Sequence, residues 1–209
     1  MLKYIFKRIL LFIPTLFMIS LLTFFLSTNV PGDPVEQMLN ANSETGSSAK
    51  AMAAEKAYID KRHQLGLDLP TFYFSISNQA TPKDLFAIPK KYHRENLSKL
   101  IKKYGNWKEI NAYYNSLKQL EINVGNIPSD TTIADALIDI KSDIQSLQIE
   151  AEDNTIKYLY KDMQVKAASS PLLADFSKQI NLSNNLYSDV INKETNYKNF
   201  IPSIHWYGF

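Results

Sequence analysis

The feature that most constrains this chain is an uncharged stretch near its N-terminus, residues 9–32. Its core, Ile9 to Leu26, is almost entirely apolar and, with its polar edge up to Thr28, is long enough for a membrane helix, which needs roughly 20 apolar residues. Only basic charges precede it: Lys3, Lys7 and Arg8. Because basic flanks stay in the cytoplasm, residues 1–28 are predicted to be a transmembrane helix with a cytoplasmic start. The bulk of the chain is then extracytoplasmic.

A cleavable signal peptide is the competing interpretation of the same segment. Signal peptides usually have a shorter apolar region, about 7–15 residues, followed by a small-x-small cleavage site. Here the apolar run is longer, and Phe24 to Asn29 contains no Ala-x-Ala. A retained helix is therefore favoured, and Pro14 falls early in it, where a kink can be accommodated.

The charge balance of the remaining chain argues against a nucleic-acid partner. Of 23 basic and 21 acidic residues, three basic ones precede residue 27, which leaves 20 against 21. A nearly neutral, mixed surface gives no electrostatic reason to bind nucleic acid. The absence of cysteine excludes a disulfide framework and thiol chemistry.

Local signals after the membrane segment predict two short helices and an ambiguous aromatic run. Asp33 is placed to cap a helix that has Pro34 at its first position. Ala51 to Leu65 has good helix formers, and Gly66 is placed at its C′ position. Asn40 to Lys50 is expected to be a loop, whereas Thr71 to Ile76 fits either a strand or a helix.

Residues from about 93 to 199 carry the pattern of a small helical bundle. Apolar positions recur at alternating spacings of three and four, which is the seam of packed antiparallel helices. The clearest stripes are Ile110, Tyr113, Leu117, Leu120 and Val124, then Ile133, Leu137, Ile140, Ile144 and Leu147. Leu97, Ile101 and Tyr104 share an earlier face, Ile156, Leu159 and Met163 continue the pattern, and Leu182, Leu186 and Val190 follow. Expected helix boundaries are Gly105 and Asn106, Gly125, Ser129 or Asp130, and Ser170 with Pro171. The fold class is therefore all-α: one transmembrane helix, then a bundle of four or five helices.

No constellation in the sequence predicts catalysis or metal binding. There is no phosphate-binding Gly-x-x-x-x-Gly-Lys-Ser/Thr loop, no Gly-x-Ser-x-Gly and no His-Glu-x-x-His. His63 and His93 are expected to be solvated helix residues, and His205 a packing or interfacial residue. We therefore expect no enzyme activity, no cofactor, and no catalytic, cofactor-binding or metal-ligating residues.

Several other features have unremarkable interpretations. The acidic group Glu150, Glu152 and Asp153 is expected to be a solvated helix face. The glycosylation patterns at Asn96 and Asn181 match by chance often, and most tyrosines and phenylalanines are expected in the core. Two aromatic groups that flank the bundle are candidates for membrane-interface belts: Phe72, Tyr73 and Phe74 on one side, and Trp206, Tyr207 and Phe209 on the other.

An ordered set of motifs resembles the start of bacterial dipeptide/oligopeptide ABC transporter permeases. The set begins with the basic start Met1 to Leu10 and the Ile-Pro-Thr-Leu of the membrane segment. A Pro-Gly-Asp-Pro element follows at Pro31 to Pro34, and a Leu-Gly-Leu-Asp-x-Pro element at Leu65 to Pro70. The resemblance covers about residues 1–75, a third of the chain.

The resemblance implies an inner-membrane subunit of a peptide importer. Its partners would be the lipid bilayer, a second permease subunit, cytoplasmic ATPase subunits and a periplasmic peptide-binding protein. The chain departs from the family after Pro70, because about 125 mostly polar residues stand where a second membrane helix is usual. The family's further membrane helices are absent, so this N-terminal piece is not expected to transport alone.

These expectations define four segments and one alternative function. Residues 1–28 form the membrane helix, 29–76 a permease-like extracytoplasmic segment, 77–200 an inserted helical domain, and 201–209 an aromatic segment leading back towards permease sequence. The alternative is a single-pass membrane-anchored protein with an extracytoplasmic helical interaction domain.

Overall fold

The structure is a computed structural model that describes residues 2–29, 32–40, 48–70, 72–128, 133–193 and 201–208. The chain divides into two compact units, Met1–Asn42 and Ser43–Phe209.

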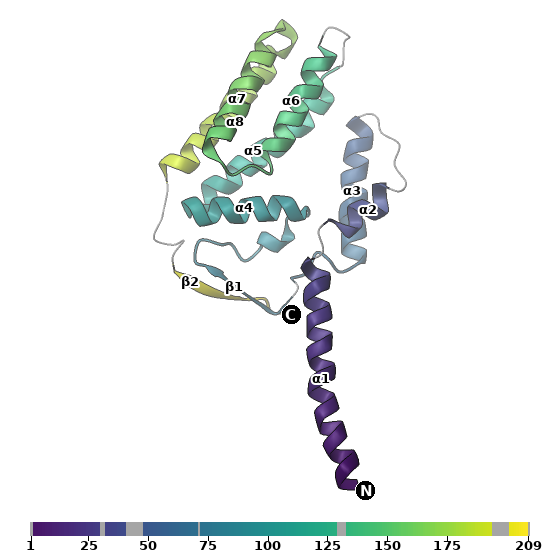
Figure 1. Cartoon of the computed structure of the whole chain (residues 1–209). Coiled ribbons are helices and arrows are strands. Elements are labelled where there is room, and N and C mark those ends of the chain that lie inside the picture. The colour runs from purple at the N-terminus through teal and green to yellow at the C-terminus, as the bar shows by residue number, and fades with distance from the viewer. Residues whose placement is uncertain are drawn as a thin grey trace. The chain divides into compact units, whose positions relative to one another are not determined.

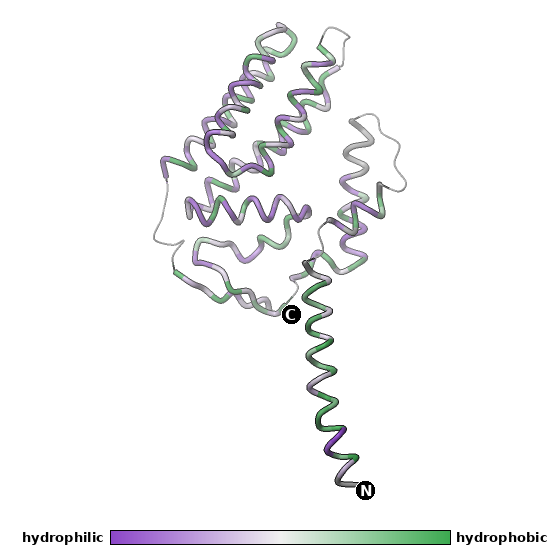
Figure 2. Tube along the Cα trace, in the orientation of Figure 1, coloured by the Kyte–Doolittle hydropathy of each residue, from purple (hydrophilic) through white to green (hydrophobic). Residues whose placement is uncertain are grey.

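The first unit consists of a long apolar helix and a short capped one. Helix α1 (Leu2–Asn29) includes Tyr4–Ser27, which is long and apolar enough to cross a membrane. Figure 2 shows this helix as a nearly continuous hydrophobic tube. Its hydroxyls are satisfied within the helix, because the Thr15 Oγ1 donates to Phe12 O (2.8 Å) and the Thr23 Oγ1 to Ile19 O (2.9 Å). Such bonding removes the cost of bringing hydroxyls into lipid. Helix α2 is Pro34–Asn40.

The second unit contains six α-helices, two 3₁₀ turns and two strands among the residues described (Figure 1). In chain order they are α3 (Ser48–Gln64), β1 (Phe74–Asn78), η1 (Leu85–Ala87), α4 (Lys91–Tyr104), α5 (Trp107–Asn126), α6 (Ala134–Leu147), α7 (Asp153–Ala168), η2 (Pro171–Leu173), α8 (Ala174–Asn192) and β2 (Pro202–Trp206). Helix α5 packs against α6 and α8, and α7 packs against the same two helices. Helix α4 contacts α5, so the bundle core is shared by all five.

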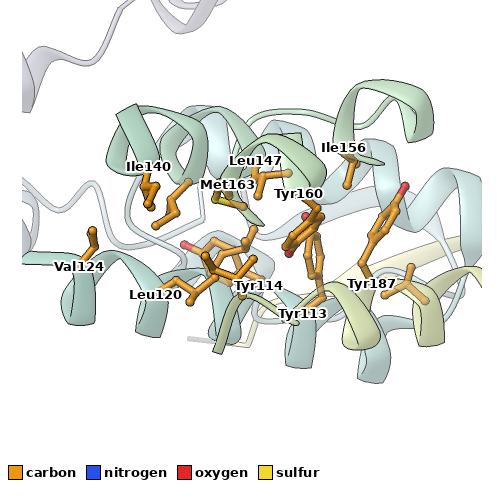
Figure 3. Close-up of a cluster of buried hydrophobic side chains, with 14 of the residues drawn as sticks. Tyr113, Tyr114, Leu120, Val124, Ile140, Leu147, Ile156, Tyr160, Met163 and Tyr187 are labelled. Atoms are coloured by element: carbon orange, nitrogen blue, oxygen red, sulfur yellow. The ribbon is translucent and has the colours of Figure 1, made fainter. Parts of the chain in front are cut away.

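The expected apolar stripes form this core. Every position of the two clearest stripes, from Ile110 to Val124 and from Ile133 to Leu147, is buried. Figure 3 shows the cluster, with Leu120 of α5, Ile140 of α6 and Tyr160 of α7 among the residues that converge from different helices. The expected helical fold with an N-terminal membrane-length helix is confirmed. The two strands were not part of this expectation. Of the run Thr71 to Ile76, which fitted either a strand or a helix, the last three residues belong to strand β1.

One stripe runs differently from the expectation. Leu182 on α8 is 61% exposed, whereas Ser183 is fully buried. The buried positions are Phe176, Ile180, Ser183, Tyr187 and Val190, again at spacings of four and three. Ser183 is accommodated because its Oγ shares hydrogen bonds with Ser116 Oγ (2.8 Å) and Tyr160 OH (2.7 Å). The polar Ser183 thus occupies a position in the core, whereas the apolar Leu182, which was expected there, is exposed.

Most helix boundaries agree with the sequence signals, but two differ. Gly105 ends α4 in the left-handed conformation (φ 73°), and Ser170 Oγ accepts from Leu172 N at the start of η2. Gly125 does not end α5, which continues to Asn126. Asn106 stands at the start of α5, but its side chain makes no cap; it donates to Val190 O on α8 (2.7 Å) instead. The expected start at Ser129 or Asp130 lies outside the described residues, as does most of the expected loop at 40–50, whose last three residues belong to α3.

Candidate functional site

The element that follows the membrane segment has the expected capped geometry. Asp33 Oδ1 accepts from Val35 N (2.9 Å), and Asp33 O accepts from Gln37 N (3.1 Å). Pro34 begins the helix, where its missing N–H leaves no bond unmade. The described part of the Pro-Gly-Asp-Pro element is therefore a helix start.

The Leu-Gly-Leu-Asp-x-Pro element is a helix stop. Gly66 has a positive φ of 65°, its N–H donates to His63 O, and Leu67 N donates to Arg62 O. This pair of bonds is a Schellman motif, which closes the last turn of α3 and requires a residue that tolerates the left-handed conformation. The glycine is thus explained by backbone geometry.

Arg62 joins this element to the chain that leads into the bundle. Its buried guanidinium donates to three main-chain carbonyls: Leu67 O (2.8 Å), Phe86 O (3.1 Å) and Ile88 O (3.1 Å). The permease-like helix α3 and the loop after β1 are therefore held in one structure. No local pattern in the sequence predicts this role of Arg62, because two of its acceptors lie 24 and 26 residues away in the chain.

Phe74 and Trp206, one from each of the two aromatic groups that flank the bundle, come together in an antiparallel pair of strands, while Phe209 lies outside the described residues. The register places Phe74 opposite Trp206 and Ile76 opposite Ile204. Two further bonds extend the ladder, from Tyr207 N to Tyr73 O (2.8 Å) and from Gln79 N to Ile201 O (3.0 Å). The chain thus enters and leaves the helical bundle at one place, as Figure 1 shows for β1 and β2.

The two faces of this sheet have opposite character. The inner face carries Ser75, Ser77, Ser203 and His205; His205 is 8% exposed and contacts Asn78 O through Nε2 (3.3 Å). The other side, which we call the outer sheet face, consists of Phe74, Ile76, Ile204 and Trp206, all exposed. The rings of Phe74 and Trp206 lie 5.6 Å apart. This is the candidate interaction site of the described chain.

The three histidines lie in three different environments. His63 is solvent-exposed as expected and pairs with Asp68 (2.6 Å), which raises the pKa of the imidazole. His205 is buried on the inner face of the sheet, which agrees with its expected packing role. His93 was expected to be solvated, but it is 2% exposed and shares a hydrogen bond with Tyr114 OH (2.9 Å). Burial, together with the nearby positive charge of Lys90, lowers the pKa of His93 to about 4.

A sequence signal for the burial of His93 existed. His93 stands four residues before Leu97 and therefore continues the buried face of α4. The expectation of solvent exposure rested on the neighbouring basic residues, which lie on the other faces of this helix.

The acidic group is also more structured than a solvated face. Asp153 Oδ1 accepts hydrogen bonds from Lys103 Nζ (2.6 Å), Tyr104 OH (2.5 Å) and Tyr187 OH (2.7 Å). Burial alone would raise the pKa of this carboxyl, but these three donors prevail and lower it to about 2. Asp153 therefore anchors the start of α7 to α4 and α8.

The remaining candidates give no binding site. Asn96 is buried and donates to Gln148 O and Glu150 O, so its amide is not open to glycosylation. Asn181 is exposed and pairs with Gln164. Within the described ranges, no group of three or more histidine and acidic side chains is arranged to hold a metal ion.

Comparison with known proteins relates part of the chain to transport permeases. The glutathione transport system permease protein GsiC of Escherichia coli (strain K12) is 40% identical over 73 residues. GsiC of Shigella flexneri serotype 5b (strain 8401) and of Shigella dysenteriae serotype 1 (strain Sd197) match to the same extent. The match covers 35% of this chain and only 21% of each relative. No family model and no solved structure matches the chain.

The match confirms the coarser part of the resemblance. Over this segment the chain is related to permeases, and with α1 it is a transporter-related membrane protein. The relationship does not extend over the whole length of the relatives, so activity, substrate and partners belong to the proposal below.

Proposed function

We propose that this chain forms the N-terminal part of the membrane subunit of an ABC importer for peptides. The observation that carries the proposal is the 40% identity over 73 residues to a glutathione transport permease. Glutathione is a small peptide, so the relative's substrate agrees with the peptide-importer motifs at Pro31 to Pro34 and Leu65 to Pro70. The partners would be a second permease subunit, cytoplasmic ATPase subunits and a peptide-binding protein outside the inner membrane.

In this proposal the helical bundle is an insertion into the permease framework. The pairing of β1 with β2 supports it, because the strand at the start of the bundle segment and the strand after that segment lie side by side. Domains are inserted most easily where their ends are close together, since the parent fold need not open. The inserted domain would lie outside the cytoplasm, given the basic start of α1.

The chain itself would neither transport nor catalyse. The described residues hold one helix long enough to span a membrane, and one helix cannot line a path for a peptide. The bundle core consists of apolar side chains and tyrosines that pack on one another, and Tyr160 OH shares a hydrogen bond with Ser183 Oγ across two helices. We assign the bundle a docking or scaffolding role rather than an enzymatic one.

Site-specific crosslinking in intact source cells tests the proposal. Cysteine at Lys141, which is exposed on α6, should crosslink to a transporter component, whereas cysteine at the adjacent buried Ile140 should not. The chain has no native cysteine, so the background is low. Affinity purification of the tagged chain should recover an ATPase subunit and a second permease. A chain that integrates into the membrane but recovers none of these would favour the single-pass anchored protein.

A further inference from the structure

The outer sheet face is an apolar surface on the side of the sheet where polar residues normally stand. Ile76 is 74% exposed and Trp206 68%, while the serines and the histidine face inward. A sheet with one solvated side usually turns its apolar residues to the core and its polar residues to water. The alternation here is inverted from Phe74 to Ser77 and from Ser203 to Trp206, and it ends at Asn78, which is buried. An exposed apolar group of this kind commonly marks an interaction surface.

The segments that form this sheet are free of charge. No Asp, Glu, Lys or Arg occurs in Leu69 to Pro82 or in Asn199 to Phe209. Phe72 and Tyr73, which precede β1 and lie outside the outer sheet face, are also exposed. A protein interface has an apolar core with a polar rim, whereas the two segments of this sheet supply no charged residue to such a rim. The face itself combines a tryptophan and a phenylalanine with two isoleucines, and tryptophan is enriched at the headgroup level of membranes.

The area of the face also argues against a second copy as its occupant. Its four side chains expose roughly 500 Å², on the scale of 150–250 Å² for one large aromatic residue. Two such faces together would bury about 1,000 Å², at the lower limit of a stable protein interface. Contact with a lipid surface does not need this much buried area, because a membrane-spanning α1 already holds the chain at the bilayer and raises the effective concentration of the lipid near the sheet.

We propose that the outer sheet face inserts into the headgroup region of the bilayer that α1 spans. The main chain of the sheet limits how deeply this face can enter the bilayer. A two-stranded sheet has main-chain N–H and C=O groups along both edges, and these need water rather than hydrocarbon. Trp206 and Phe74 therefore reach the boundary between headgroups and acyl chains. The contact fixes the base of the helical bundle against the membrane, and it requires a retained α1 but not the permease assignment.

Quenching of Trp206 fluorescence in reconstituted vesicles tests the contact. The chain has two tryptophans, and Trp107 packs partly against the bundle core, so a Trp107→Phe variant reports on Trp206 alone. The full-length variant is placed in phosphatidylcholine vesicles containing lipids brominated near the headgroup or deep in the acyl chains. We expect loss of most Trp206 emission with the shallow bromines and a smaller loss with the deep ones. The matching Trp206→Phe variant, which reports on Trp107, should keep its emission.

Variants of the outer sheet face distinguish lipid contact from other occupants. Ile76→Ser with Ile204→Ser should relieve the quenching, whereas Ile138→Ser, an exposed position on α6, should not. Emission that is unquenched by lipid and open to iodide would overturn the proposal, because the face would then be free in water. Emission that is unquenched but shielded from iodide would also overturn it, and would point to a second copy or another protein on the face.

Discussion

The rings of Phe74 and Trp206 lie 5.6 Å apart although the whole helical bundle separates them in the chain. Each ring also stands directly opposite the other in the register of the strands. The pairing holds the chain before the bundle and the chain after it side by side. This geometry agrees with the proposed insertion, and the same two rings belong to the outer sheet face.

Topology can be measured with single cysteines, because the chain has none of its own. Basic residues before α1 and no acid to offset them predict that the start stays in the cytoplasm. In cells with a permeabilised outer membrane, cysteine at Lys141 should react with a membrane-impermeant maleimide. Cysteine at Lys7 should react only after lysis. The reverse pattern would contradict the orientation.

The bundle core should be intolerant of charge at one position and tolerant at its neighbour. Ile140 is fully buried on α6, whereas Ile138 on the same helix is 66% exposed. Ile140→Asp buries an unpaired carboxylate and should cost more than about 3 kcal/mol of unfolding free energy. Ile138→Asp should change it by less than about 0.5 kcal/mol. Urea titration of the detergent-solubilised full chain, followed by circular dichroism, measures both, and equal melting of the two variants would refute the packing.

Arg62 should control the stability of the joint between α3 and the loop before α4. Arg62 uses three different nitrogens to reach Leu67, Phe86 and Ile88, whereas the single nitrogen of Arg62→Lys cannot reach all three carbonyls and leaves some of them unpaired. The expected loss is about 2–4 kcal/mol. Limited trypsin digestion should then cut faster at Lys83 and Lys90. Lys56→Gln, an exposed change on the same helix, is the control, and unaltered cleavage in Arg62→Lys would show that the joint does not depend on this side chain.

His93 should make the free energy of unfolding depend on pH. The dependence falls in the pH range in which His93 takes up a proton in the unfolded chain but not in the folded one. Its folded pKa is about 4 and its ordinary value 6.5, so the unfolded state binds a proton first as pH falls. The contribution is fully present above pH 6.5 and is lost progressively down to about pH 4. The loss is on the order of 3 kcal/mol.

Urea midpoints measured in buffers from about pH 8 to about pH 4 test this dependence, because this range covers the titration of His93 in the unfolded chain. His93→Gln should abolish the loss attributed to His93. His63→Gln should not, because His63 is exposed and its pKa is raised rather than lowered. Identical pH profiles for wild type and His93→Gln would exclude a buried neutral imidazole.

Helix positions and the bundle core were predictable because they depend on local spacing. Apolar residues at intervals of three and four must share a face, so Ile110 to Val124 and Ile133 to Leu147 could be assigned to the core from the chain alone. The stop at Gly66 was equally local, because it needs only a left-handed residue after the last turn. By contrast, Leu182 was assigned to the core wrongly, since its neighbour Ser183 gains buried partners that no local pattern shows.

By itself the sequence determined what each segment prefers: lipid for the uncharged run before Thr28, and helices wherever the three-and-four spacing continues. These preferences come from interactions within a few residues. Only the tertiary structure decided the contacts between distant residues, which local spacing cannot specify. It paired β1 with β2, bonded Arg62 to the carbonyls of a distant loop, and enclosed His93 beside Tyr114. The physical reason is that a donor, a strand edge or a ring is satisfied by whichever partner the folded chain brings to it.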